Sequence, residues 1–185
     1  KGADAIYLGG KDFSLRAHAA NFTDDEIREI VEIAHSRGKK VFVTVNIIPR
    51  NDDFDQIIDY AKRLDALKVD AVIVADLGVI KVFREHTSLA NHVSTPAKIN
   101  NKHTALEFIR LGATRLVLAR ELNIAEIKEI CNAVKGKAEI EVFVHGAMCV
   151  SYSGRCLLSN YMTNRSSKRG DCAHSCRYKY VLQEM

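Results

Sequence analysis

The sequence predicts an α/β fold, a TIM-type (β/α)8 barrel that is incomplete in this chain. Short apolar runs alternate with segments of helical periodicity, and the pair returns roughly every 25–30 residues, as in a repeating βα unit. The runs are apolar throughout, which is typical of parallel strands buried on both faces. No G-x-G-x-x-G motif follows the first run, so a doubly wound open sheet is the less favoured alternative.

The first two strands and the helix between them are placed by their boundary signals. We expect a strand at 5–8 and then a helix that begins after Thr23, with Glu26 at the spacing of a capping box. Gly38 ends that helix, because glycine readily takes the left-handed conformation required after a last turn. A second strand follows at 40–46, where β-branched residues are dense.

The same alternation continues along the chain, so that six or seven of the eight barrel strands are expected. We divide the chain into a partial barrel at 1–145 and a cysteine-rich metal-binding segment at 146–185, which includes the final strand of the same domain. Further helices are predicted at 54–67, 77–86, 102–111 and 123–134. Further strands are predicted at 71–76, 91–94, 115–119, 139–145 and 178–183.

Length and composition limit the class of protein. The chain has 185 residues, 47% of them hydrophobic, which is enough for one domain with a sizeable core. No apolar run approaches the length of a membrane span and no signal peptide is visible, so we expect a cytoplasmic protein. The chain opens in a strand pattern without a methionine, and we expect it to be part of a longer protein. The net charge of +4 fits either a solvated surface or an anionic partner.

Four cysteines crowd the last fifth of the chain: Cys149, Cys156, Cys172 and Cys176, with the spacing C-x6-C-x15-C-x3-C. Thiolates are soft ligands, and four of them close together favour zinc or an iron–sulfur cluster. Zinc modules typically use C-x2-4-C pairs, which the first pair does not match, yet spacing alone leaves both metals open. Cys131 falls instead on a predicted apolar helix face, where we expect a reduced, buried thiol.

Polar side chains gather where the predicted strands end. In a TIM-type barrel, the carboxyl ends of the strands carry the active site. We predict catalytic roles for Asn46 and Asp76, which can bind substrate hydroxyls, for Arg120, and for His145, which can transfer a proton near neutral pH. Any one of these side chains can instead cap a helix or bond a loop. We expect Glu121 to form a buried ion pair that braces the barrel.

The cysteine-rich region resembles the signature of the peptidase U32 family, whose members bear the historical name of collagenase-like proteases. The resemblance extends upstream and covers nearly the whole chain. The matching stretches of the cysteine-rich region are 141–149, 150–159 and 169–177. The matching stretches of the strand region are 2–10, 43–46, 74–76 and 118–122.

Within that family, residues 151–161 look most like the branch that hydroxylates the wobble uridine of transfer RNA; other branches modify ribosomal RNA or hydroxylate the ubiquinone ring. The resemblance implies prephenate as the hydroxyl-donor metabolite. It also implies a 4Fe–4S cluster, rather than zinc, held by the signature cysteines, Cys149, Cys156, Cys172 and Cys176. With tRNA as the partner, we expect phosphate contacts from the interleaved basic residues, Arg155, Arg165, Lys168, Arg169 and Arg177.

Two alternatives stay open, a peptidase and a non-catalytic scaffold whose cysteines only staple the loop. The sequence has no nucleophile elbow, no H-E-x-x-H motif and no obvious serine–base pair, so it does not favour the peptidase. Two departures from the family pattern matter. Pro96 stands where relatives usually carry glutamine. Some relatives draw the fourth cluster ligand from a cysteine farther downstream, so Cys176 ranks below the other three.

Overall fold

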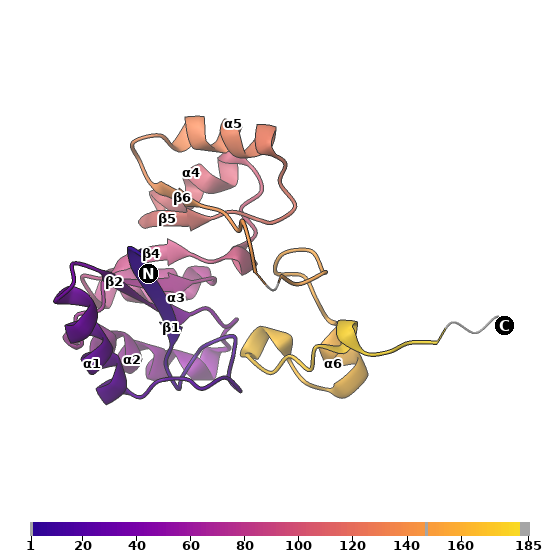
Figure 1. Cartoon of the computed structure of the whole chain (residues 1–185), viewed down its shortest axis with the longest axis horizontal. Helices are drawn as coiled ribbons and strands as arrows, with labels where there is room; N and C mark the ends of the chain where they lie inside the picture. The colour runs from indigo at the N-terminus through magenta and orange to yellow at the C-terminus, as the bar shows by residue number, and fades with distance from the viewer. Residues whose placement is uncertain (1, 147, 182–185) are drawn as a thin grey trace.

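The protein is a curled half-barrel of six parallel strands, followed by a loop-rich segment (Figure 1). The computed structural model describes residues 2–146 and 148–181. The strands are β1 (Ala5–Gly9), β2 (Lys40–Val45), β3 (Ala71–Val74), β4 (Ala90–Val93), β5 (Ala113–Val117) and β6 (Glu139–Glu141). The helices are α1 (Asp24–His35), α2 (Phe54–Ala66), α3 (Leu77–His86), α4 (Lys102–Arg110), α5 (Ile124–Val134) and α6 (Leu158–Thr163).

The strand order confirms the predicted barrel type. Every strand pairs in parallel with its neighbour in sequence, in the order β1-β2-β3-β4-β5-β6. A doubly wound sheet reverses its order at a switch point, and this sheet does not. Among the helices of the described residues, none is both long enough and apolar enough to cross a membrane.

The apolar core lies between the outer face of the sheet and the helices. Val41 and Val43 of β2 are fully buried, as are Ile27 of α1 and Ile57 and Leu64 of α2. Strand residues two apart point to the same face, so the alternate positions of β2 point away from these helices. The core therefore fixes which strand residues line the inside of the barrel.

The inner face carries a polar cluster near the amino ends of the strands. Arg115 of β5 binds Glu139 at 2.6 Å and Glu141 at 3.3 Å, and its guanidinium lies 5.0 Å from the centre of the Phe42 ring. The ring of His92 meets Phe42 edge-on. Burial, and then the charge of Arg115, lower the pKa of His92 to about 4, so the ring is neutral at pH 7. A cavity of about 260 Å³ lies beside these side chains.

Side-chain caps start the helices where the sequence predicts them. The capping box of α1 is present: the Thr23 side chain accepts from the Glu26 N–H at 3.3 Å, and Glu26 accepts from the Thr23 N–H at 2.7 Å. Asn123 and Glu126 form a second capping box at α5, and the Asn101 side chain caps α4 by accepting from the Thr104 N–H. Each cap satisfies donors that the first helical turn leaves unpaired. The chain after α1 turns through Gly38 at a φ of +65°, as the sequence predicts.

Two predicted strands differ from the structure, and the structure contains one additional helix. The sixth strand, predicted to reach His145, ends at Glu141, whose carbonyl accepts from the Leu118 N–H at 2.9 Å; the chain over 142–145 is irregular and exposed, because it does not continue the pairing with β5. The predicted strand at 178–183 is irregular over 178–181, and 182–183 lie outside the described residues. Helix α6 was not predicted, and its six residues have no side-chain cap at the amino end.

Candidate functional site

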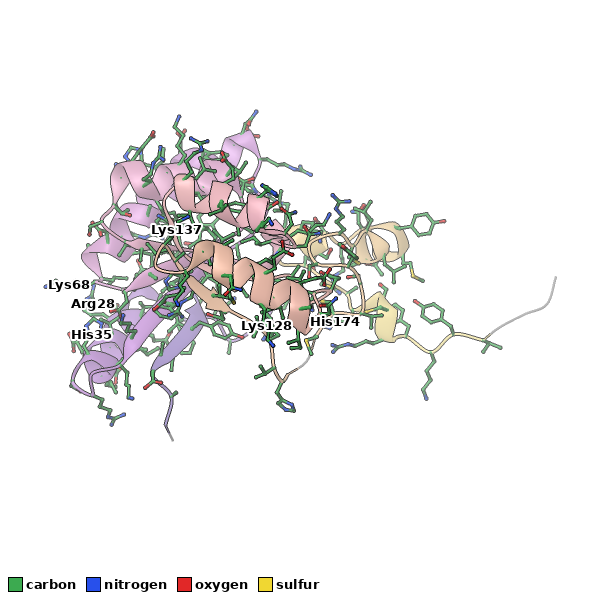
Figure 2. The ribbon with its side chains drawn as sticks, turned by 90° about the horizontal axis from the view of Figure 1, so that it is seen from above. Arg28, His35, Lys68, Lys128, Lys137 and His174 are labelled. Carbon is green, nitrogen blue, oxygen red and sulfur yellow. The ribbon has the colours of Figure 1, made fainter. Side chains whose placement is uncertain are left out.

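The candidate site lies where residues 142–181, here called the cysteine segment, pack against the carboxyl ends of the strands. The loops after β1, β2, β4 and β5 all contact it. Figure 2 shows His174 of this segment far from His35, the last residue of α1, and from Lys68, which follows α2 at the opposite end of the barrel. This is the end of the barrel at which the sequence predicts the active site.

The first attachment of the segment is to the loops after β4 and β5. Ser153 is fully buried: its hydroxyl accepts from the Arg120 N–H at 3.3 Å, and its own N–H donates to the Glu121 carboxylate. Gly154 has a φ of +68°, and a Cβ there would lie 2.2 Å from the carbonyl oxygen of Pro96. Only glycine fits both the backbone conformation and this close approach.

The predicted buried ion pair of Glu121 is not what the structure contains. Its carboxylate is largely exposed and accepts hydrogen bonds from the backbone of the cysteine segment. Burial raises the pKa of Glu121, but hydrogen bonds from Ser153 and from the backbone of Glu121 itself, together with the charge of Arg120, outweigh that effect and leave the pKa lowered. Glu121 thus holds the segment to the barrel rather than bracing the barrel itself.

The second attachment is to the loops after β1 and β2. The Lys168 carbonyl accepts from the Ile48 N–H at 2.9 Å, and the Gly170 carbonyl accepts from the Ala17 N–H at 3.2 Å. Gly170 is buried at a φ of +89°, and a Cβ there would lie 2.5 Å from the Ser14 carbonyl oxygen. The backbone of the segment therefore lies directly on the loop after β1.

An ion pair reinforces this second attachment. Arg169 donates to both carboxylate oxygens of Asp53, at 2.7 and 2.9 Å, in the bidentate geometry that makes such pairs strong. The Arg169 guanidinium, together with the Arg50 N–H, lowers the pKa of Asp53 to about 2. A neighbouring carboxylate, Asp171, binds Arg165 at 2.7 Å and His18 at 2.8 Å.

The cysteines lie between and beyond the two attachments. All five thiols of the chain are free; Cys156 and Cys172 are half-buried, while Cys149 and Cys176 are exposed. Burial lowers the pKa of the Lys168 ammonium, and the thiols of Cys156, Cys149 and Cys172 oppose that effect. These three thiols are thus close enough to one side chain to act on its charge.

The donor set fits a soft metal group, although the ligands are not assembled. Four thiols within 28 residues are the donors that zinc and iron–sulfur clusters require. Within residues 2–146 and 148–181, no three His, Cys, Asp or Glu side chains stand close enough together to hold a metal ion. Binding of a metal group would therefore have to bring the thiols of the segment closer to one another.

The predicted catalytic residues after β2 and β3, Asn46 and Asp76, form hydrogen bonds within the protein. The Asn46 side chain accepts from the Leu15 N–H at 3.1 Å and donates to Ser94 at 3.4 Å. Asp76 caps α3, accepting from the N–H groups of Gly78 and Val79 at 2.8 and 3.2 Å. Both lie at the carboxyl ends of their strands, and their catalytic roles stay predictions.

Arg120 and His145 lie closer to the cysteines. An Arg120 Nη donates to the Cys149 carbonyl at 3.5 Å, and its buried Nε has no partner among the described residues. His145 is exposed on the irregular chain after β6. Of the four predicted catalytic side chains, Arg120 is the one held between the barrel and the thiol loop.

The predicted phosphate contacts divide into two groups. Arg165 and Arg169 are engaged by Asp171 and Asp53, and Lys168 is half-buried beside the thiols. Arg155 and Arg177 are exposed. Sequence reasoning missed the carboxylates that engage the arginines, because Asp53 lies 116 residues from Arg169 and nothing local links them.

Together, the fold and the thiol-bearing segment at the carboxyl ends of its strands define a class, the TIM-type barrels with a cysteine-rich insertion. The model of peptidase family U32 matches residues 1–185, and the chain belongs to that family. The solved structure of the U32 peptidase Mk0906 is similar in fold, with a TM-score of 0.64 and 23% identity, over 76% of this chain and 60% of that chain.

Two curated relatives are similar over 99% of the chain. The tRNA hydroxylation protein P1 of Bacillus subtilis is 44% identical, over 43% of its own length. The 23S rRNA 5-hydroxycytidine C2501 synthase of Escherichia coli is 41% identical, over 27% of its own length. The chain thus spans less than half the length of these relatives.

Proposed function

We propose that the chain is the barrel part of an RNA-modifying enzyme that hydroxylates the wobble uridine of tRNA. The observation that carries this proposal is the 44% identity to a tRNA hydroxylation protein over 99% of the chain. The surplus of basic residues in the cysteine segment supports it. Among the Lys, Arg, Asp and Glu residues of 142–181, six are basic and one is acidic, Asp171.

A 4Fe–4S cluster at the mouth of the half-barrel is part of the proposal. Cys149, Cys156 and Cys172 would hold it, with Cys176 or a cysteine farther along the protein as the fourth ligand. The support is physical: the described residues of the cysteine segment that are buried are Ser153, Ser159, Gly170 and Ser175, all small and none of them apolar in side chain. A segment without an apolar core of its own gains from metal ligation the free energy that burial does not supply.

Different arginines of the chain would bind the tRNA phosphates and the reacting molecules. Arg155 and Arg177, exposed on the segment, would contact tRNA phosphates, and each contact would make binding weaker as salt is added. Arg120, between β5 and the Cys149 loop, would bind an anionic group of the substrate or of prephenate, the proposed hydroxyl donor. The cluster, when bound, supplies electron transfer or Lewis acidity at iron.

The function is tested by deleting the gene in its source organism and measuring the wobble nucleosides of tRNA by mass spectrometry. We expect 5-hydroxyuridine derivatives to fall, and to return when the full-length gene is restored on a plasmid. Restoration by the wild-type gene but not by a Cys149→Ser variant would tie the activity to the thiols. No change in these nucleosides in the deletion strain would contradict the proposal.

The cluster is tested separately, by anaerobic purification of the full-length protein with iron and sulfide analysis. We expect about four iron and four sulfide per chain, the content of one such cluster. One equivalent of zinc with no iron would replace the cluster by a zinc site.

A second candidate is hydroxylation of ribosomal RNA, which the 41% identity to the 23S rRNA 5-hydroxycytidine C2501 synthase favours. The same mass spectrometry distinguishes it, because the missing nucleoside would then be found in rRNA digests and not in tRNA. The family name leaves the peptidase as a third candidate.

A further inference from the structure

The two attachments of the cysteine segment hold different thiols. Ser153 and Gly154 lie between Cys149 and Cys156 in the sequence, and they are held at the loops after β4 and β5. Arg169 and Gly170 lie three and two residues before Cys172, and they are held at the loops after β1 and β2. The thiols that would share one metal group are therefore anchored at separate sides of the same barrel mouth.

We propose that the Asp53–Arg169 ion pair is a positioning contact, which holds Cys172 at the barrel mouth where it can share a metal group with Cys149 and Cys156. This inference rests on the metal centre of the proposed function, and it assigns to Arg169 a role within the protein rather than on RNA. Asp53 and Arg169 would not touch the metal. They act through the position of the chain that carries Cys172.

The geometry around the pair supports this role over that of a surface ion pair. The Asp53 and Arg169 side chains keep only 18% and 33% of their exposure, whereas the surface pair of Lys102 and Glu129 keeps 42% and 63%. Both carboxylate oxygens of Asp53 are used by Arg169, and one also accepts from the Arg50 N–H at 2.6 Å. The Asp53 carboxylate is thus held in place by both Arg169 and the Arg50 N–H.

The backbone beside the pair leaves Cys172 little freedom. On the amino-terminal side of Cys172, the carbonyls of Lys168 and Gly170 are bonded to the barrel loops. On its carboxyl side, the Ala173 N–H donates to the buried Ser159 hydroxyl at 2.9 Å. Arg169 lies between Lys168 and Gly170, so breaking its ion pair would weaken the first of these two constraints and leave the second.

The test compares Asp53→Asn, Arg169→Met and the charge-reversed double variant Asp53→Arg/Arg169→Asp in the full-length protein. Glu129→Gln, which removes the surface pair with Lys102, is the matched control. In the iron-loaded protein, we expect both single variants to lose iron to a chelator about tenfold faster, the factor for losing a charge-assisted hydrogen bond. The double variant should recover part of this loss, and the control should match the wild type.

A second measurement does not depend on bound metal. In the apo protein, alkylation by iodoacetamide, followed by mass spectrometry of each peptide, should speed up at Cys172 in both single variants but not at Cys131 of α5. A merely structural effect would speed up both thiols together, and that result would overturn the proposal. So would unchanged rates at Cys172 and unchanged iron loss. Wild-type protein that contains no iron would contradict the iron–sulfur cluster of the proposed function. The alkylation rates would still test the positioning role of the ion pair.

Discussion

The half-barrel and the cysteine segment are held together by different forces. In the described residues, every buried apolar side chain precedes residue 142, and those of β2, α1 and α2 pack as one core. The cysteine segment buries serines and a glycine, while Val150, Leu157 and Tyr161 keep 73% or more of their exposure. The comparison indicates that the half-barrel is stabilised by apolar burial and that the segment depends on its attachments to the half-barrel.

The largest expected effect is in the half-barrel core. Leu64→Ala removes a fully buried side chain of α2 and should lower the free energy of unfolding by about 3–4 kcal/mol, through lost burial and the cavity that remains. Leu157→Ala, in the cysteine segment, should change it by less than about 0.5 kcal/mol. Urea denaturation measures both changes. Equal losses of stability would contradict the conclusion that apolar burial stabilises the half-barrel and not the segment.

The next effect is at the first attachment. Gly154→Ala places a Cβ against the Pro96 carbonyl at a positive φ and should cost about 2–3 kcal/mol, unless the segment detaches. Gly136→Ala is the control, because it has a φ of +74° with open space around it and should cost only about 1 kcal/mol. Limited proteolysis within 142–181 should rise for Gly154→Ala alone. Equal proteolysis of both variants would show that the contact with Pro96 does not hold the segment.

The second attachment predicts a dependence on pH. The folded-state pKa of Asp53 is about 2, below its ordinary value, so its carboxylate stabilises the folded state above about pH 4 and loses that contribution as the pH falls toward 2. Asp53→Asn should cost about 1–2 kcal/mol at pH 7. The difference from wild type should shrink on acidification, as measured by urea denaturation at several pH values. A constant difference would show that the charge of Asp53 is not what matters.

The smallest effect on stability is expected at the exposed arginines. Arg177→Ala should leave the free energy of unfolding within about 0.5 kcal/mol of wild type. It should weaken binding to tRNA and lower the slope of log affinity against log salt by about 1. Binding titrations at several salt concentrations measure this slope. An unchanged slope would remove Arg177 from the RNA interface.

The barrel was predictable from the sequence because its signals are local. The capping box at Thr23 and the β-branched run of β2 each lie within a few residues, and both are confirmed. The end of β6 was not predictable, since it depends on how far the pairing with its partner β5 continues. An apolar, β-rich run after Glu141 looks like a strand whether or not a partner accompanies it.

The position of the candidate site was predictable from the sequence, but its attachments were not. Four thiols at close spacing are visible in the sequence, and the structure brings their segment to the predicted end of the barrel. The sequence does not show which carboxylates the arginines meet: Arg169, expected to contact RNA, binds the sequence-distant Asp53, and Arg165 binds Asp171. Asp76 shows the converse: a polar residue at a strand end also serves as a helix cap.

The sequential strand order has a consequence for how the protein is made. Each strand pairs with the one synthesised just before it, so the contacts of the sheet are short in sequence and can form as the chain leaves the ribosome. The four cysteines of the segment emerge after the barrel loops that the segment contacts. Assembly of the proposed metal centre would then be a late step, on a half-barrel that has already folded. A nascent chain that stalls before residue 142 would already expose the loops at the carboxyl ends of the strands.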